Sequence, residues 1–156
     1  MKKIALTLLA STIASTCQAA SQCQKNESLI FNCITRHSRA SLCESKKDET
    51  LVYRATSQGK LRLQISEPNK GSIFFLSSTP YAGGGEAHIR FSNADYTYYL
   101  YDKTIKSDDG PIFSSGIVIY HHAKRISNLI CSNDASIHQK AYGRITSEPY
   151  IDIQSK

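Results

Sequence analysis

Residues 86–101 read EAHIRFSNADYTYYLY, two β-prone runs on either side of a polar turn at residues 92–95. In the first run apolar and polar side chains alternate with the period of a half-buried strand. The predicted inward side chains are Ala87, Ile89 and Phe91, and the predicted outward ones are Glu86, His88 and Arg90. The second run, residues 96–101, is rich in tyrosine and is the most β-prone stretch of the chain. Together the two runs predict a pair of strands joined by a turn.

Similar runs recur along most of the chain. In residues 61–65 (LRLQI) the alternation is perfect, so Leu61, Leu63 and Ile65 are expected to face a core. A Ser-Gln-Gly-Lys turn signal at residues 57–60 separates this run from a strand predicted at residues 51–56. Further strands are predicted at residues 28–35, 39–44, 72–76, 116–120 and 125–131.

The spacing of these runs favours one all-β domain. Eight or so short strands, about ten residues apart, are typical of an antiparallel sandwich or barrel. Residues 77–85 are expected to form a glycine-rich loop, residues 107–111 to interrupt the strand pattern, and residues 135–142 to favour a helix weakly. We therefore predict a single antiparallel β-sandwich or barrel of about eight short strands, tied by disulfides, with at most one short C-terminal helix.

The first 19 residues are typical of a secretory signal peptide. Lys2 and Lys3 precede an uncharged apolar run at residues 4–14, and small residues follow before the expected cleavage after Ala19. The β-rich domain is therefore expected to span residues 20–156 and to reside in the bacterial periplasm. Because the apolar run is shorter than the roughly 20 residues of a membrane span, an anchor helix is disfavoured. Lipidation at Cys17 is the alternative.

Four cysteines remain after cleavage, namely Cys23, Cys33, Cys43 and Cys131. An even number in an oxidising compartment indicates two disulfides, whose connectivity a sequence leaves open. A hairpin folded about Ser38 would place Cys33 opposite Cys43 and leave Cys23 for Cys131. Zinc is the competing interpretation, but no C-x-x-C or C-x-x-H spacing occurs in this chain.

The charge of the chain disfavours a nucleic-acid partner. The full sequence has a net charge of +6 from 19 Lys and Arg against 13 Asp and Glu, and loss of the two N-terminal lysines leaves 17 against 13, or +4. The only paired cations left are Lys46-Lys47 and Lys124-Arg125. Nucleic-acid binding usually needs a clustered basic patch with interleaved aromatic residues. Ordinary surface charge that keeps the protein in solution explains this balance best, and a weak contact with an anionic envelope surface is the alternative.

No catalytic motif stands out. The chain has no G-x-S-x-G, and Ser114-Ser115-Gly116 precedes a predicted strand, as a turn or bulge would. Paired carboxylates occur at Asp108-Asp109 and around Glu44, in polar stretches that solvated loops explain. We expect a non-enzymatic protein without a cofactor or metal, although a hydrolase with an unrecognised site remains an alternative.

Two segments are candidate contacts for a partner. The glycines Gly83, Gly84 and Gly85, with Tyr81 and Glu86 beside them, lead into a strand and so do not form a phosphate-binding loop. They are either a mobile recognition loop or a simple hairpin connection. The second segment is His121-His122, and neighbouring histidines can chelate one metal only if they lie in a turn, since adjacent strand residues point to opposite faces.

The order of motifs resembles a group of small exported all-β proteins of Gram-negative bacteria. The matching segments are residues 81–86 (YAGGGE), 89–93 (IRFSN), 96–98 (YTY), 115–119 (SGIVI) and 124–131 (KRISNLIC), with the Cys33 to Cys43 hairpin and residues 52–54 (VYR) upstream. The chain departs from the group at residues 121–123, where a glycine-containing turn is usual. Such proteins are similar in kind to periplasmic lysozyme inhibitors and to immunity proteins, and the resemblance implies no catalytic residues.

These observations lead to an expected function of partner neutralisation. We expect a periplasmic immunity protein that plugs the active site of a delivered antibacterial effector, with contacts at Tyr81, residues 83–86, and His121-His122. The alternatives are a module that binds envelope polymer or anionic lipid, and an inhibitor of lysozyme. The last is disfavoured because lysozymes are usually basic and this domain is basic too.

Overall fold

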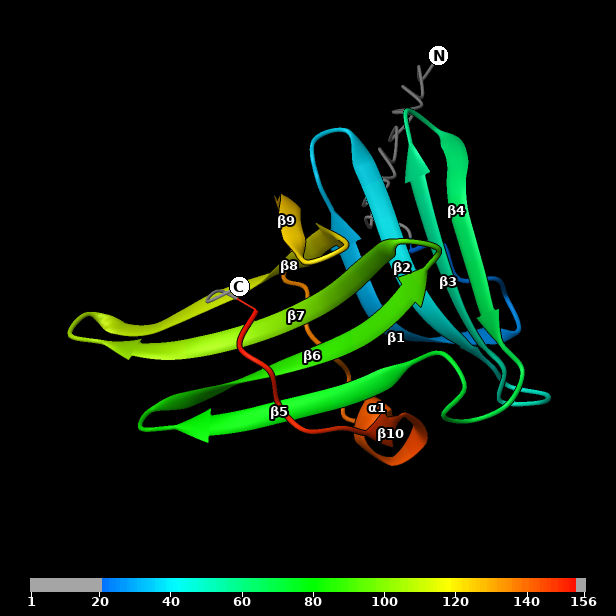
Figure 1. Ribbon diagram of the computed structural model, residues 1–156. Coiled ribbons are helices and arrows are strands. Elements are labelled where there is room, and N and C mark those ends of the chain that lie inside the picture. The colour runs from blue at the N-terminus through cyan, green and yellow to red at the C-terminus, as the bar shows by residue number, and fades with distance from the viewer. Residues whose placement is uncertain (1–20, 154–156) are drawn as a thin grey trace, which may run out of the picture.

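The computed structural model describes residues 21–153, which form two β-sheets packed face to face (Figure 1). The signal peptide predicted over residues 1–19 lies outside the described residues. Within residues 21–153, no helix is long and apolar enough to cross a membrane.

The first half of the domain is a four-stranded sheet in which each strand pairs antiparallel with the next along the chain. The predicted turn between its last two strands is made by Gln58 and Gly59, both with positive φ, as the tight turns that suit the strand twist require. The strands are β1 (Glu27–Ile34), β2 (Ser38–Ser45), β3 (Leu51–Ser57) and β4 (Lys60–Glu67).

The second half is a six-stranded sheet in the order β10-β5-β6-β7-β8-β9. Two-residue turns join β5 through β9 into a meander, and β10 returns from the C-terminal region to pair parallel with β5. The elements are β5 (Phe75–Tyr81), β6 (Gly84–Asn93), β7 (Tyr96–Ser107), β8 (Gly110–His121), β9 (Lys124–Ile130), the helix α1 (Lys140–Arg144) and β10 (Thr146–Ser147). The predicted fold class, a disulfide-tied sandwich with one short C-terminal helix, is confirmed, with ten strands in the described residues instead of about eight.

Apolar side chains from both sheets meet in one core. Phe31 and Leu42 face it from the first sheet, and Phe91 and Leu100 face it from the second, all fully buried. Tyr53 lies across the interface, with its ring centroid 4.6 Å from that of Phe91. The alternation of residues 86–91 thus predicted the core-facing side of β6 correctly.

The outer face of the six-stranded sheet is buried as well. The C-terminal segment, residues 148–153, runs across this face (Figure 1) and places Ile153 against Tyr99, Tyr101 and Tyr120. The Tyr120 hydroxyl donates to the backbone carbonyl of Ile153 at 2.6 Å. Burial on both faces explains why this sheet is rich in apolar and aromatic residues on both sides of its strands.

The described residues hold two disulfides, Cys23–Cys43 and Cys33–Cys131, so all four cysteines of this part of the chain are bridged as predicted. The pairing that the hairpin favoured is wrong. A two-residue turn at residues 36–37 sets a register in which Cys33 lies opposite Ala40, and Cys33 shares the core face while Cys43 lies on the other face of its strand. The disulfides indicate an oxidising, extracytoplasmic environment.

Several boundaries differ from the prediction. Residues 77–81 are not a loop, because β5 continues to Tyr81 and only residues 82–83 form the turn. Residues 107–111 do not interrupt the pattern, since β7 and β8 continue to a two-residue turn at residues 108–109. Leu61 was expected in the core but is 57% exposed, because a bulge between Ala55 and Thr56 shifts the β3–β4 register near that end.

Candidate functional site

Two hairpin ends lie side by side at one end of the six-stranded sheet and project beyond the first sheet (Figure 1). One is the β5–β6 turn, and the other is the end of the long β7–β8 hairpin, where Ile105 pairs with Ile112 and Thr104 with Phe113. We call residues 81–84 and 104–113 the tip surface. It includes Tyr81, Gly83 and Gly84, which the sequence singled out, and hairpin residues that it did not.

The glycines of residues 83–85 fix this arrangement by their lack of a side chain. Gly83 has a φ of +83°, and a Cβ there would lie 2.5 Å from the Cβ of Lys106. At Gly84 a Cβ would lie 1.9 Å from the backbone oxygen of Thr104. These residues therefore form a close hairpin connection packed against β7, and the two ends of the tip surface are held together as one unit.

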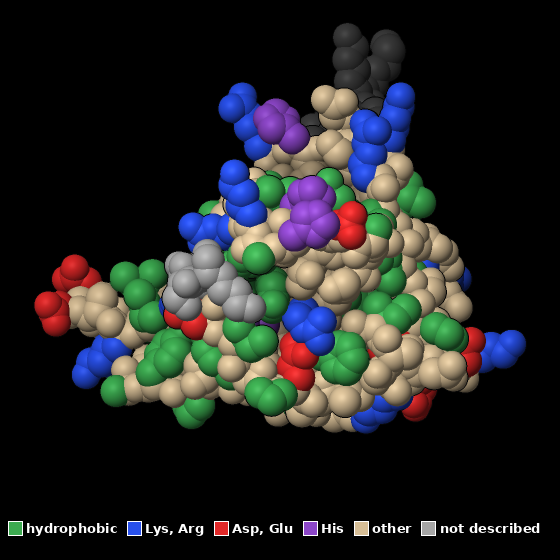
Figure 2. All heavy atoms as spheres, viewed as in Figure 1, with side chains coloured by type: hydrophobic (Ala, Val, Ile, Leu, Met, Phe, Trp, Pro, Cys, Tyr) green, Lys and Arg blue, Asp and Glu red, His purple; other side chains and the backbone are tan. Residues whose placement is uncertain are grey.

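The tip surface exposes large apolar side chains. Phe113 is 72% exposed, Ile112 50%, Ile105 38% and Tyr81 37%. Figure 2 shows hydrophobic side chains gathered behind the acidic end of this projection, which carries Asp108 and Asp109. Exposed apolar clusters rimmed by polar groups mark interaction sites in soluble proteins. The sequence offered one signal for this hairpin, the turn-forming residues Asp108-Asp109-Gly110 between Ile105 and Ile112.

A buried polar cluster lies directly behind Tyr81. The Glu86 carboxylate accepts a hydrogen bond from the Tyr81 hydroxyl at 2.9 Å. It also lies 2.5 Å from His88 Nε2 and forms an ion pair with Lys103 Nζ at 3.1 Å. The ring of Tyr150 from the C-terminal segment stacks on His88 at 5.1 Å. The prediction that Glu86 and His88 face water is wrong, because residues 148–153 cover this face and leave both residues buried.

The pKa values within this cluster follow from burial and hydrogen bonding. Burial alone would raise the pKa of Glu86, but hydrogen bonds from His88, Tyr81 and Lys103 outweigh it and hold the pKa below its ordinary value. Burial lowers the pKa of His88, although Glu86 acts in the opposite direction. Burial and Glu86 raise the pKa of Tyr81. Because His88 and Glu86 lie away from solvent, the cluster positions Tyr81 and is not itself a contact surface.

His121 and His122 lie at the other end of the same sheet. β7 pairs with β8 over its whole length, with Tyr96 opposite His121 and Ser107 opposite Gly110, so roughly 30 Å of strand separate these histidines from the tip surface. The structure therefore does not bring the two predicted contact segments together. His122 lies in the β8–β9 turn with a φ of 53°, and its backbone N–H donates to the Asp95 carbonyl at 2.9 Å.

Three potential metal-binding groups meet at this turn. Asp95, His121 and His122 each offer one donor atom, and these atoms lie within 4.8 Å of one another. The turn thus satisfies the condition under which neighbouring histidines can share an ion. Two imidazoles and a carboxylate suit a divalent ion such as Zn²⁺.

Glu44 is also placed differently from the prediction. It was expected in a solvated loop, but it is buried and pairs with Arg144 Nε at 3.2 Å and with Lys140. Asp108 and Asp109 do lie in an exposed turn. Neither group of carboxylates forms a pair facing a shared cavity, so the structure offers no glycosidase-like arrangement among these residues.

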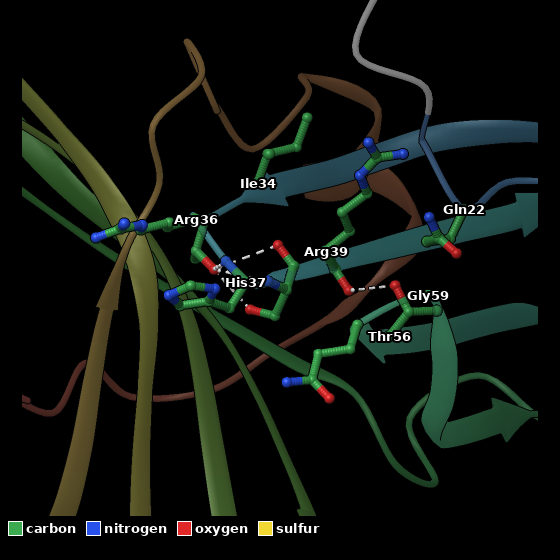
Figure 3. Close-up of a pocket in the computed structure, with 10 residues that line it drawn as sticks. Gln22, Ile34, Arg36, His37, Arg39, Thr56 and Gly59 are labelled. Atoms are coloured by element: carbon green, nitrogen blue, oxygen red, sulfur yellow. Dashed lines mark hydrogen bonds between the residues drawn. The ribbon is translucent and has the colours of Figure 1, made fainter.

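Two cavities meet at the same end of the sandwich as His121. A cavity of about 560 Å³ is lined by Arg36, His37 and Arg39 together with residues of the β3–β4 turn (Figure 3). Beside it, a cavity of about 360 Å³ opens between the two sheets and is lined mainly by apolar side chains. Sequence reasoning missed both, because their walls combine residues from eight strands that lie in different parts of the sequence.

No family model, curated protein or solved structure matches this chain.

Proposed function

We propose that this protein is a periplasmic, non-enzymatic binding protein that neutralises a partner enzyme, as an immunity protein does against a delivered antibacterial effector. The observation that carries the proposal is the tip surface, where Phe113 is 72% exposed on a hairpin that projects beyond the sandwich. An exposed aromatic anchor on a rigid element is the usual centre of a protein interface. The resemblance to small envelope β-proteins supports the same class of function.

The mechanism is steric. The β7–β8 hairpin enters the active-site cleft of the partner with Phe113 on one face and Ile112 on the other, because adjacent strand residues point to opposite faces. Phe113 fills an apolar pocket there, and the β5–β6 turn broadens the Ile112 face through Tyr81. Little ordering is required on binding, since each glycine contact and ladder hydrogen bond fixes the hairpin in advance. A basic hydrolase is a second candidate partner, because Asp108 and Asp109 at the hairpin end favour a positively charged cleft although the net charge of the domain opposes the encounter.

The test is capture and inhibition with the exported, processed protein. We expect the immobilised wild type to retain an envelope-degrading enzyme from secretions of competing bacteria, and an equimolar amount to abolish the activity of that enzyme. Phe113→Asp should weaken binding by about a hundredfold, as loss of an interface anchor does. Because the side chain is mostly exposed, this change should leave the free energy of unfolding within about 0.5 kcal/mol.

Ile126→Asp is the matched control, since Ile126 is 52% exposed on β9, outside the tip surface. It should bind and inhibit like the wild type. Capture of no enzyme, or equal capture by Phe113→Asp, would show that the tip surface is not an inhibitory site.

A further inference from the structure

The two cavities at the end of the sandwich opposite the tip surface have complementary chemistry. The smaller one lies between the sheets, and its apolar lining comes from both: Tyr53 and Leu63 from the first sheet, and Tyr98, Ile117, Ile119 and Leu129 from the second. Its volume of about 360 Å³ is near the lower limit of ligand pockets, about 300–1,000 Å³. This space suits one alkyl chain better than a two-chain lipid.

The larger cavity is polar and cationic. It is lined by Arg36 and His37 of the β1–β2 turn and by Arg39 of β2, together with Thr56 and Gly59. In Figure 3 the side chains of Arg36 and Arg39 extend in opposite directions. The conformation of the turn is fixed, because the Gln58 N–H donates to the His37 carbonyl at 3.1 Å. Arginine guanidinium groups are well suited to bind carboxylate or phosphate groups.

The two cavities are continuous at their rims. Thr35, Ser38, Arg39 and Thr56 line both, so a molecule can occupy the apolar cavity and extend into the cationic one. Arg62 adds a further cation to the apolar cavity, and no Asp or Glu lines either cavity in the described part of the chain. Arg36, Arg39 and Arg62 form no ion pair with a described residue. Figure 2 shows basic and histidine side chains gathered at this end of the molecule.

We propose that this end of the sandwich binds an anionic amphiphile with a single alkyl chain. The chain lies between the sheets against Tyr98 and Ile119, and its carboxylate or phosphate group lies at the shared rim near Arg39, with Arg36 and Arg62 adding positive charge. Burial of the chain supplies the affinity, while the arginines select a negative charge. This site is independent of the proposed inhibitory function, because it lies at the opposite end of the molecule from Phe113.

Binding of dodecanoate to the exported, processed protein tests the proposal, with calorimetry at concentrations below micelle formation. We expect saturable 1:1 binding of dodecanoate. Dodecyltrimethylammonium, with the same chain and the opposite charge, should bind at least about tenfold more weakly, and acetate should show no saturable binding. Equal affinity for the two dodecyl compounds would overturn the proposal. So would sedimentation with phosphatidylglycerol vesicles without any dodecanoate binding, since that result indicates surface adsorption.

Two variants localise the site. The double change Arg36→Glu and Arg39→Glu alters exposed side chains and should reduce dodecanoate affinity by roughly tenfold or more. Its matched control is Lys46→Glu with Lys47→Glu, the same change of charge on the exposed β2–β3 turn outside both cavities, which should leave affinity unchanged. Ala55→Phe fills the apolar cavity and should abolish binding while thermal unfolding remains cooperative. Equal losses from the two charge variants would mean that net charge, not this site, holds the ligand.

Discussion

Glu86 and His88 lie on the face of β6 that side-chain alternation predicts, but they are buried there and not exposed to water. Both point away from the main core, as the alternation of residues 86–91 indicates. The same face, however, is covered by the C-terminal segment, so both are buried. The Glu86 carboxylate interacts with Tyr81, Lys103 and His88 Nε2, whereas His88 Nδ1 is buried without a hydrogen-bond partner among the described residues. A buried network of this kind is stable only while Glu86 stays ionised and the His88 ring stays neutral.

The stability of the domain should therefore fall on acidification. The folded state lowers the pKa of His88 from its ordinary value of 6.5, so the free energy that favours the neutral ring is present above about pH 6.5 and is lost as the pH falls below it. The pKa of Glu86 is also lowered, from 4.5, so its contribution is lost at still lower pH. Both pKa shifts therefore lower the free energy of unfolding as the pH falls. The measurement is the free energy of unfolding in urea at pH 7.5, 6 and 5.

The variant His88→Gln isolates the histidine contribution, because glutamine can keep a hydrogen bond to Glu86 but does not titrate. It should be less stable than the wild type at pH 7.5, and the difference should shrink toward pH 5. The control His138→Gln changes an exposed histidine of the C-terminal region and should keep the wild-type pH dependence. A parallel pH dependence for His88→Gln and the wild type would contradict the assignment.

At the scale of elements, the segment of residues 148–153 has a larger role than its lack of regular structure suggests. Ile153 is buried among the tyrosines of β7 and β8, and Glu148 pairs with Arg90 of β6 at 2.6 Å. The segment thereby turns a one-sided sheet into a sheet buried on both faces. It also supplies Tyr150 to the cluster behind Tyr81, where burial and the Glu86 carboxylate raise the pKa of Tyr150 to about 12.

Removal of one hydroxyl should loosen this segment. Tyr120→Phe deletes the donor to the Ile153 carbonyl, a bond of 2.6 Å, at a cost of about 1 kcal/mol. Local opening of residues 148–153 should then be about fivefold more frequent, which amide hydrogen exchange and carboxypeptidase digestion both report. Tyr142→Phe, at an exposed tyrosine of α1, should exchange like the wild type. Unchanged protection in Tyr120→Phe would mean that Ile153 packing and the Glu148–Arg90 ion pair hold the segment without this hydrogen bond.

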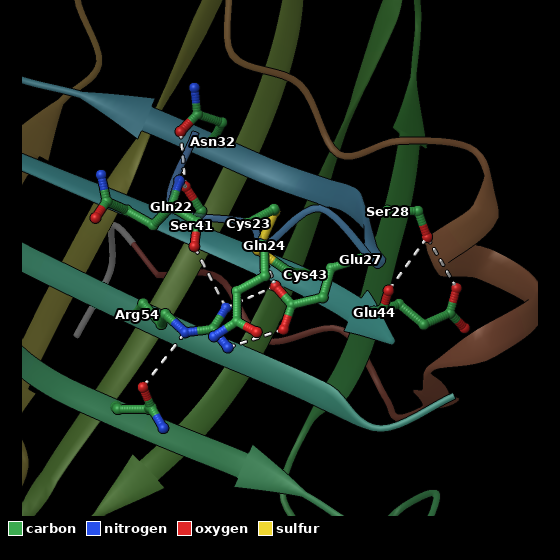
Figure 4. The surroundings of a disulfide bond; sticks show 11 residues. Gln22, Cys23, Gln24, Glu27, Ser28, Asn32, Ser41, Cys43, Glu44 and Arg54 are labelled. Atoms are coloured by element: carbon green, nitrogen blue, oxygen red, sulfur yellow. Dashed lines mark hydrogen bonds and ion pairs between the residues drawn. A yellow bond between two sulfur atoms is a disulfide. The ribbon is translucent and has the colours of Figure 1, made fainter. Parts of the chain in front are cut away.

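At the scale of the whole molecule, the two disulfides have different structural roles. Cys23–Cys43 fastens the segment before β1 to the outer face of the first sheet, beside the ion pair of Arg54 and Glu27 at 2.7 Å (Figure 4). Cys33–Cys131 joins the first sheet to the segment that follows β9, so it connects the two halves of the sandwich. The sequence separations are 20 and 98 residues, respectively.

The disulfide that closes the longer loop, Cys33–Cys131, should contribute more to the free energy of unfolding. Loop-closure entropy assigns about 4.7 kcal/mol to Cys33–Cys131 and about 3 kcal/mol to Cys23–Cys43. We therefore expect Cys33→Ala with Cys131→Ala to lower the urea midpoint more than Cys23→Ala with Cys43→Ala does. The two double variants are matched in that each removes one buried cysteine of the first sheet and one half-buried partner. A larger loss from the shorter loop would show that native-state packing, not chain entropy, dominates.

The sequence by itself determined much of the domain. Side-chain alternation and turn residues depend on neighbours within a few positions, so the all-β class, most strands and the core side of β6 could be predicted. The number of cysteines predicted two bridges, and the glycines of residues 83–85 marked part of the tip surface. Each of these inferences rests on local geometry.

Only the tertiary structure decided which cysteines pair, which side of β6 the C-terminal segment covers, and which predicted contacts lie together. The pairing depends on a register set by a two-residue turn, and a shift of one residue moves a side chain to the other face. The burial of Glu86 and His88 depends on residues about 60 positions away, which no periodicity encodes. The tip surface and the cavities at the opposite end exist because separate hairpins meet in space, and the register of β6, β7 and β8 places Tyr81 and His121 at opposite ends of one sheet.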